Sequence, residues 1–202
     1  IEPLRWYYHC DRLGMIVWQD MVSCFEGWRT LTMQVLPFLG LHLHDAPSAR
    51  LGRAGEPGRQ QFLRAMDPTR PIDHASGWHD QGGGDLKSRH VYYRPVRLKN
   101  DGRRVLALTE FGGYSLQCPG HLATDKKFGY RMYDDAAAWM DAVEKLYETE
   151  VLPLIQAQGL SAAVYTQLSD VEDEVNGLVT FDRRMCKMDP ARMRKINEKL
   201  HF

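Results

Sequence analysis

A carboxylate at the end of an apolar segment is the strongest sign of chemistry in this sequence. Residues 104–110, RVLALTE, place four apolar residues just before Thr109 and Glu110. Such a run predicts a buried strand, so Glu110 would be costly to bury unless water, a partner or a substrate meets it. Gly112 and Gly113 follow, and they would let the backbone turn closely. We interpret Glu110 as functional; a structural glutamate paired with an arginine is the alternative.

A second candidate site is the loop GWHDQGGGD at residues 77–85. Its glycines match neither a phosphate loop nor a dinucleotide fingerprint, because the required Lys and the following helix are absent. An aromatic ring with polar neighbours suits a sugar: Trp78 can stack on a pyranose face, while His79, Asp80 and Gln81 can bond hydroxyls. A tryptophan packed structurally in its loop is the alternative.

Two further patterns resemble metal sites only superficially. Residues 169–177, SDVEDEVNG, begin like an EF-hand loop, but Arg183 stands where the loop requires a final glutamate. A solvated acidic loop is therefore the expectation. His42 and His44 beside Asp45 lack a distant third ligand, so no metal and no cofactor are predicted.

These residues must be positioned by short strands that alternate with helices. The pattern predicts helices over 2–13, 58–66, 134–157 and 189–200, and strands over 15–20, 71–76, 87–93, 104–110 and 161–167. This alternation is typical of an α/β fold with a mostly parallel sheet. Chemistry gathers at the carboxyl ends of strands in (β/α) barrels, and the residues there are Asp20, His74, Tyr92, Tyr93, Glu110 and Gln167.

Helix ends are marked by local signals. Gly14 is a typical C-terminal cap, Asp134 or Asp135 can cap the long helix, and Asp189 precedes Pro190 at the start of the last helix. Pro153 should kink the long helix near its end or begin a new turn.

Composition limits the function classes. The chain has 202 residues, enough for one sizeable core, and Lys+Arg and Asp+Glu both number 26. A net charge of zero argues against nucleic-acid and anionic-membrane partners. No apolar run reaches the ~18 residues of a membrane span. Four scattered cysteines favour reduced thiols in a cytoplasmic protein, with disulfides as the alternative.

Taken together, several segments resemble the catalytic barrel of glycoside hydrolase family 2, the β-galactosidase and β-glucuronidase family. The resemblance covers most of the chain, in the right order. It rests on YYHCDRLGMIVWQDM (7–21), DPTRPIDHASGWHDQGGGD (67–85), SRHVYYRP (88–95), LTEFGGYS (108–115) and AAVYTQLSDVEDEVNGLVTFDRR (162–184).

The resemblance implies a (β/α)8 TIM barrel over residues 1–202, incomplete in this sequence and without the preceding β-sandwich domains. Strands 3 and 5–8 are recognisable. The implied activity is retaining hydrolysis of a β-galactoside or β-glucuronide type of bond. Glu110 matches the nucleophile, and Tyr92 or Tyr93 matches a tyrosine that could hold it as a carboxylate.

A carbohydrate substrate is thus the expected partner. A homo-oligomer is also possible on this resemblance. The matching segments also nominate substrate-binding residues, namely Trp78, Asp80, His90, Tyr92, Tyr93, Gln167 and Asp20.

The chain departs from the family in two places. It starts in the helix before strand 3, as if part of a longer polypeptide, and it lacks the strand-4 segment with the acid/base glutamate. A missing segment is expected near 58–66, at the join of Phe62 and Leu63. Glu26 is a weak substitute, so the acid/base residue is unknown. Activity of this chain alone is therefore doubtful, and a non-catalytic carbohydrate-binding barrel or an inactive fragment is the alternative.

Overall fold

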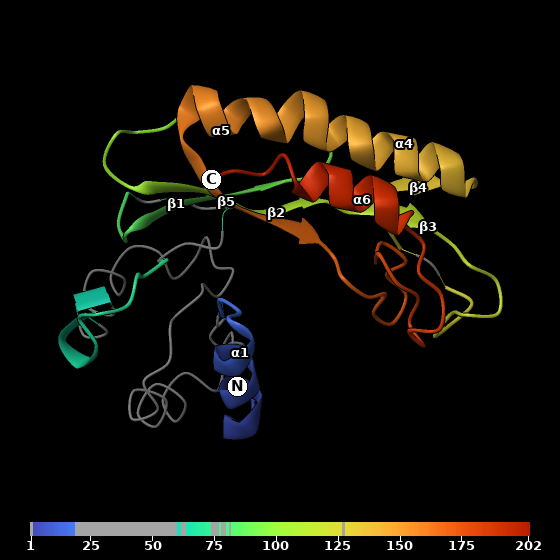
Figure 1. Cartoon of the computed structure of the whole chain (residues 1–202), viewed down its shortest axis with the longest axis horizontal. Helices are drawn as coiled ribbons and strands as arrows, with labels where there is room; N and C mark the ends of the chain where they lie inside the picture. The colour runs from blue at the N-terminus through green and yellow to red at the C-terminus, as the bar shows by residue number, and fades with distance from the viewer. Residues whose placement is uncertain are drawn as a thin grey trace. The chain divides into compact units, whose positions relative to one another are not determined.

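The structure is a computed structural model that describes residues 2–18, 60–61, 64–73, 77, 80, 82–126 and 128–202. The chain divides into two compact units, residues 1–88 and residues 89–202, which are described separately. Figure 1 shows the secondary structure of the chain.

The first unit begins with helix α1, Leu4–Leu13, which ends where Gly14 adopts the left-handed conformation, as predicted. Residues 60–61 and 64–66 are also helical, within the helix expected over 58–66. The segment before β1 is fixed by polar contacts. The Asp85 amide donates to the Ile72 carbonyl at 2.8 Å, and the Asp85 carboxylate accepts from the Ile72 amide at 2.7 Å.

Two predicted strands are wrong where the structure describes them. Residues 15–18, which are all apolar, and residues 71–73, which centre on Ile72, are both irregular. An apolar run becomes a strand only when a neighbouring strand accepts its backbone hydrogen bonds. At Ile72 those groups bond to Asp85 instead, and Ile16 is almost fully exposed. The remaining residues of both predictions, 19–20 and 74–76, lie outside the described residues.

The described sheet at the candidate site has three strands in the order β1-β2-β5. They are β1, Leu86–Val91; β2, Val105–Gly112; and β5, Leu160–Thr166. All three were expected from the sequence. Strands β2 and β5 are parallel, with Phe111 opposite Tyr165 and Gly112 opposite Thr166. The eight-stranded barrel stays a prediction.

Strand β2 continues beyond the residue where we expected it to end. Phe111 is fully buried and Gly112 still pairs with β5, so Glu110 stands two residues before the end. The turn then begins at Gly112 and Gly113, whose φ angles are 85° and 62°. A Cβ on Gly112 would lie 2.3 Å from the Tyr165 ring, so this position requires glycine.

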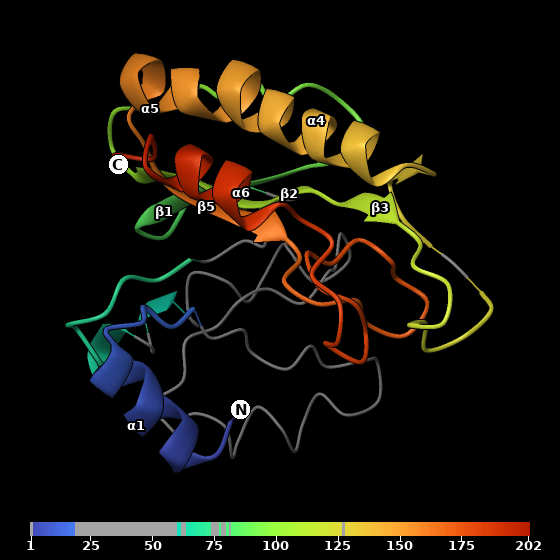
Figure 2. The same ribbon diagram turned by 45° about the vertical axis from the view of Figure 1, so that its right-hand side comes forward.

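One helical column covers the sheet (Figures 1 and 2). It consists of α4, Ala136–Leu146; the π-helical segment η2, Tyr147–Val151; and α5, Leu152–Gln158. The Asp135 side chain caps α4 by accepting from the Ala138 amide. Pro153 sits in the first turn of α5, and the Leu152 amide just before it donates to the Tyr147 carbonyl, five residues back.

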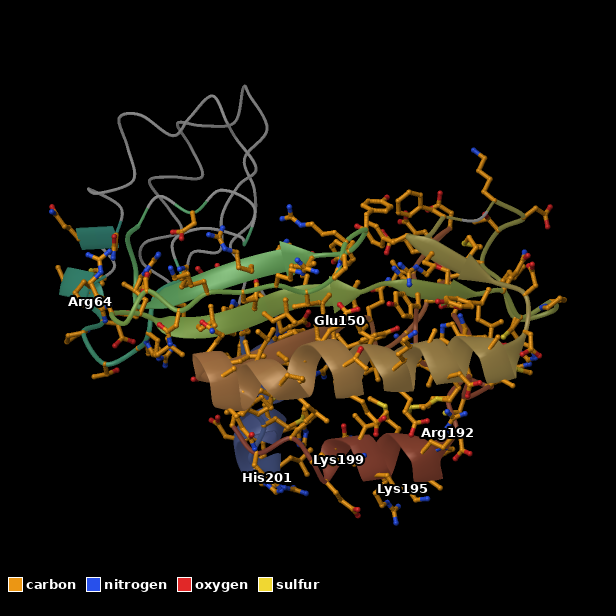
Figure 3. All side chains as sticks on the ribbon, turned by 90° about the horizontal axis from the view of Figure 1, so that it is seen from above. Arg64, Glu150, Arg192, Lys195, Lys199 and His201 are labelled. Atoms are coloured by element: carbon orange, nitrogen blue, oxygen red, sulfur yellow. The ribbon has the colours of Figure 1, made fainter. Side chains whose placement is uncertain are left out.

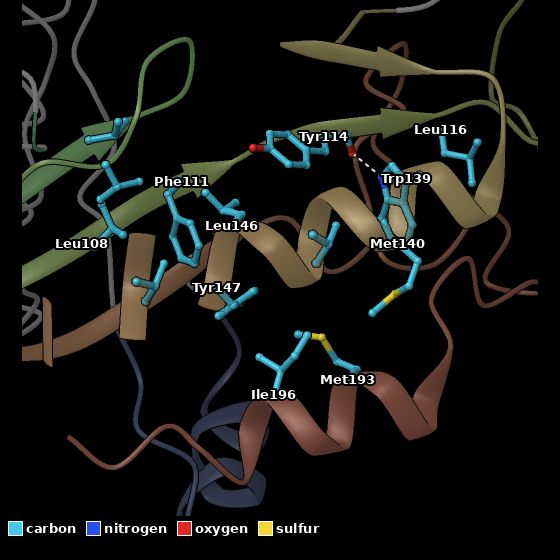
Figure 4. Close-up of a cluster of buried hydrophobic side chains, with 14 of the residues drawn as sticks. Leu108, Phe111, Tyr114, Leu116, Trp139, Met140, Leu146, Tyr147, Met193 and Ile196 are labelled. Atoms are coloured by element: carbon cyan, nitrogen blue, oxygen red, sulfur yellow. Dashed lines mark hydrogen bonds between the residues drawn. The ribbon is translucent and has the colours of Figure 1, made fainter. Parts of the chain in front are cut away.

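The core lies between this column and the sheet (Figure 4). Trp139 is fully buried, and its indole N–H donates to the Tyr114 carbonyl at 2.9 Å, which satisfies its only polar atom. The cluster also includes Leu106, Leu108, Phe111, Val143, Leu146, Tyr147, Val151, Leu160, Met193 and Ile196.

Helix α6, Pro190–Asn197, packs against α4 and is capped by Asp189, as the sequence predicted. On its exposed side Arg192 bonds Asp141 and Glu144 of α4 (Figure 3). Two short strands, β3, Tyr114–Leu116, and β4, Arg131–Tyr133, pair in parallel and were not predicted.

A buried ion pair organises the loop between β5 and α6. The Lys187 ammonium donates to Asp170 at 2.7 Å, to the Leu116 carbonyl at 2.8 Å and to the Val175 carbonyl at 3.1 Å. The side chains of Lys187 and Asp170 are 0% and 2% exposed. The expectation that 169–177 is a solvated acidic loop is therefore wrong for Asp170 and for Val175–Gly177, which are buried.

Within the described part of the chain, no helix is both long and apolar enough to cross a membrane. No group of three His, Cys, Asp or Glu side chains there could hold a metal ion.

Candidate functional site

The candidate site is built around the Glu110 carboxylate on β2. Its side chain is 41% exposed, although the strand on both sides of it is buried. The Tyr92 hydroxyl donates to Glu110 Oε2 at 2.6 Å, and His90 Nδ1 lies 3.1 Å from the same oxygen. Both partners belong to the stretch that forms β1 and the residue after it. The sheet order β1-β2 thus brings a carboxylate, a phenol and an imidazole together.

The Tyr92 hydroxyl is held as a hydrogen-bond donor. Its burial raises its pKa far above the ordinary value, and the Glu110 carboxylate raises the pKa further. Tyr92 therefore keeps its proton throughout the neutral range. The hydroxyl also lies 3.0 Å from Thr166 Oγ1, at the end of β5. Three adjacent strands thereby fix the orientation of one carboxylate oxygen.

The two candidate tyrosines have different environments. Tyr92 is buried and contacts Glu110, as one of the two was expected to do, whereas Tyr93 is 69% exposed. Both rings meet Tyr130. The Tyr92 ring stacks on it at 3.8 Å between centroids, and the Tyr93 ring meets it edge-on at 5.1 Å.

His90 was predicted to bind substrate, and its side chain is only 3% exposed. Its Nδ1 lies 3.1 Å from Oε2 of Glu110. The structure therefore assigns it a place beside the candidate functional carboxylate, while a direct contact with substrate stays a prediction.

Gln167 belongs to a second polar group just after β5. Its amide donates to Glu174 Oε2 at 2.9 Å and to Asn176 Oδ1 at 2.7 Å. Asn176 in turn donates to the same Glu174 oxygen at 3.2 Å. The Gln167 amide thus bonds Glu174 directly and also bonds Asn176, which donates to Glu174 in turn, and substrate binding by Gln167 stays a prediction.

Several predicted residues are not placed by this geometry. Trp78 and Asp20 lie outside the described residues, as do His79, Gln81, His42, His44, Glu26 and the join of Phe62 with Leu63. Asp80 is described in the first unit, where its carboxylate accepts from the Gly82 amide at 2.9 Å. Its predicted role toward a sugar stays untested.

Sequence reasoning missed three residues of this region. Thr166 stands immediately before Gln167, so its position at the end of a predicted strand was a usable signal. Tyr130 and Glu174 come from irregular segments, and no periodicity indicates where such segments lie. Only the backbone bonds between these segments reveal it: the Phe128 amide donates to the Asp173 carbonyl at 2.6 Å, and the Val175 amide to the Phe128 carbonyl at 3.2 Å.

The chemical capacity of the group follows from its contacts. A half-exposed carboxylate accepts a hydrogen bond from a phenol that cannot lose its proton near neutral pH. Such a group can attack an electrophilic carbon or carry a proton.

Comparison with known proteins adds a likeness of fold. No protein-family model matches the sequence, and no curated protein is significantly similar to it. Among solved structures, the Beta-glucuronidase of Faecalibacterium prausnitzii is similar over 97% of this chain, with a TM-score of 0.58 and 12% sequence identity. This chain spans 41% of the length of that enzyme.

A beta-D-Glucuronidase of Dictyoglomus thermophilum also matches, over 80% of this chain and 32% of its own, with 14% identity and a TM-score of 0.48. At these sequence identities the comparison shows a similarity of fold alone, and it rests on the first structure, which has the higher TM-score.

Proposed function

We propose that this chain is part of the catalytic barrel of a retaining β-glycosidase, with Glu110 as the nucleophile. The observation that carries the proposal is the 2.6 Å hydrogen bond from Tyr92 to a half-exposed Glu110 near the carboxyl end of a buried strand. The fold likeness to a β-glucuronidase supports the same class of reaction. The substrates proposed are β-galactosides or β-glucuronides.

The reaction has two displacement steps. In the first, an oxygen of Glu110 attacks the anomeric carbon, the bond to the leaving oxygen breaks, and an acid protonates that oxygen. In the second, the deprotonated acid takes a proton from water, the water oxygen attacks the anomeric carbon, and the bond to the Glu110 oxygen breaks, which restores both the carboxylate and the acid. Tyr92 and His90 both approach Oε2 of Glu110 and hold the carboxylate in place for the attack. The acid/base carboxylate should lie ~5–5.5 Å from Glu110.

The direct test is covalent trapping. A 2-deoxy-2-fluoro β-glycoside with a dinitrophenyl leaving group needs no acid for its departure, so the chain itself can be tested whatever residue supplies the proton. Galacto- and glucurono-configured reagents should be compared. We expect the protein mass to rise by one fluorosugar, on the peptide that contains Glu110. A label on another residue, or no label on folded protein with either reagent, would exclude this nucleophile.

Tyr92 supplies a second prediction. Tyr92→Phe removes one hydrogen bond to a charged group and should slow trapping at Glu110 roughly 10- to 100-fold. The control is Tyr8→Phe, which removes a hydroxyl from a 59% exposed ring of α1 and should leave the rate near that of the wild type. Measurement of the trapping rate by intact mass separates the two cases. Equal rates for the two variants would contradict the assigned role of Tyr92.

A further inference from the structure

An aromatic surface lies next to the Glu110 site and is used by none of the steps above. Phe128 is 44% exposed and Tyr93 is 69% exposed, and both rings meet Tyr130 edge-on, at 5.6 Å and 5.1 Å between centroids. We call these three rings the aromatic surface. Since Tyr130 also stacks on Tyr92, the surface is continuous with the residue that holds Glu110.

This surface is fixed in place by backbone bonds. Phe128 pairs with Glu174 in a short parallel bridge, through the two hydrogen bonds that its backbone makes with Asp173 and Val175. The Val175 carbonyl is in turn bonded by the buried ammonium of Lys187. An exposed phenylalanine on an anchored segment costs little ordering entropy when it binds a ligand.

The edge of the surface carries an oriented acceptor. Gln167 and Asn176 both donate to one oxygen of Glu174, which fixes the direction of that carboxylate. Glu174 and Glu110 both raise the pKa of Tyr130, after its burial, which places Tyr130 within electrostatic reach of both carboxylates. Aromatic faces beside a fixed acceptor suit a pyranose, whose C–H face is apolar and whose rim carries hydroxyl donors.

We propose that the aromatic surface and Glu174 form a binding subsite for a second, neutral sugar unit of the substrate. This inference rests on the proposed function, since it takes Glu110 as the point of reaction. It names the substrate class as β-linked oligosaccharides. The preference for a neutral unit follows from charge, because the Glu174 carboxylate would repel a uronate bound at this position.

The test is calorimetric binding without turnover. The probes are a methyl β-galactoside, neutral β-linked galacto- and gluco-disaccharides to tetrasaccharides, and a disaccharide whose second unit is a uronic acid. We expect affinity to rise from the monosaccharide to the neutral disaccharide, and to be weaker for the uronate. Phe128→Ala should weaken disaccharide binding about 3- to 10-fold and leave the monosaccharide unchanged. Glu174→Gln should weaken the neutral disaccharide and reduce the discrimination against the uronate.

The matched control is Phe181→Ala, because Phe181 is 45% exposed and is not one of the three rings. Equal affinity for monosaccharide and disaccharide, or equal effects of the Phe128 and Phe181 variants, would overturn the subsite. The proposed function fails separately, when Glu110 is not labelled by the fluorosugar. If Phe128→Ala weakens oligosaccharide binding but Glu110 is not labelled, the sugar subsite is supported and the proposed reaction at Glu110 is rejected.

Discussion

Replacement of Glu110 by glutamine is expected to lower turnover roughly 10⁴-fold or more, the scale on which loss of an essential catalytic group acts. The amide is nearly isosteric with the carboxylate but is a poor nucleophile. It can still accept the Tyr92 hydrogen bond, so the fold and sugar binding should persist. The measurement is hydrolysis of a dinitrophenyl β-glycoside, with circular dichroism and calorimetric sugar binding on the same sample.

Chemical rescue makes this result specific. In Glu110→Ala the lost carboxylate leaves space, and added azide should attack the anomeric carbon to give a glycosyl azide of inverted configuration. A merely structural glutamate would give no such product. Glu198→Gln is the matched control, because Glu198 is exposed at the end of α6 and should keep full activity. Full activity in Glu110→Gln would show that another residue is the nucleophile.

Replacement of Lys187 by methionine is expected to destabilise the protein by about 3–5 kcal/mol, because it leaves the buried Asp170 without its cation. It also removes the donor for the Leu116 and Val175 carbonyls. In a domain of this size the melting temperature should fall by roughly 10 °C. Thermal unfolding monitored by circular dichroism measures it.

The control is another lysine in another setting. Lys199 lies just after α6 (Figure 3) and pairs with Glu148, and both side chains are well exposed, so solvent screens the charges and Lys199→Met should change the melting temperature little. The double variant Lys187→Met with Asp170→Asn should recover part of the loss, because no unpaired charge then remains buried. If the two lysine variants unfold at the same temperature, the buried pair contributes no more to the free energy of unfolding than the exposed pair does.

The elements that the sequence predicts well are those with local signals. Asp189 before Pro190 marks the start of α6, and Asp135 marks the start of α4, because capping depends on a few adjacent residues. Strands β2 and β5 are fully visible as apolar runs. Strands β3 and β4 are not, since three residues carry no periodicity and their pairing depends on segments far apart.

The site is predicted in part for the same reason. Glu110 and Tyr92 each come near the end of a segment that the sequence predicts as a strand, and such ends meet at one edge of a parallel sheet. Lys187 shows the limit: a lysine in a polar loop predicts exposure, and only tertiary contacts give it three buried acceptors. Residues 15–18 show the opposite error, because their apolar run predicts a strand and the structure describes them as irregular.

The π-helical segment Tyr147–Val151 determines what an insertion or deletion of one residue in the helical column would do to the packing. Each residue of an α-helix rotates the next by ~100°, so the wide turn offsets α5 from α4 around their common axis. The buried stripe of α4, with Trp139 and Val143, continues through the π-helical segment at Tyr147 and Val151, and α5 then buries no residue completely. Glu150, within the segment, accepts from the Val96 amide at 2.6 Å and ties the turn to the chain after β1 (Figure 3). A one-residue deletion here would therefore act as a rotation, which would separate Glu150 from Val96 while Trp139 kept its place. At this segment, the gain or loss of one residue therefore changes the angular position of α5 relative to α4 more than it changes the length of the column.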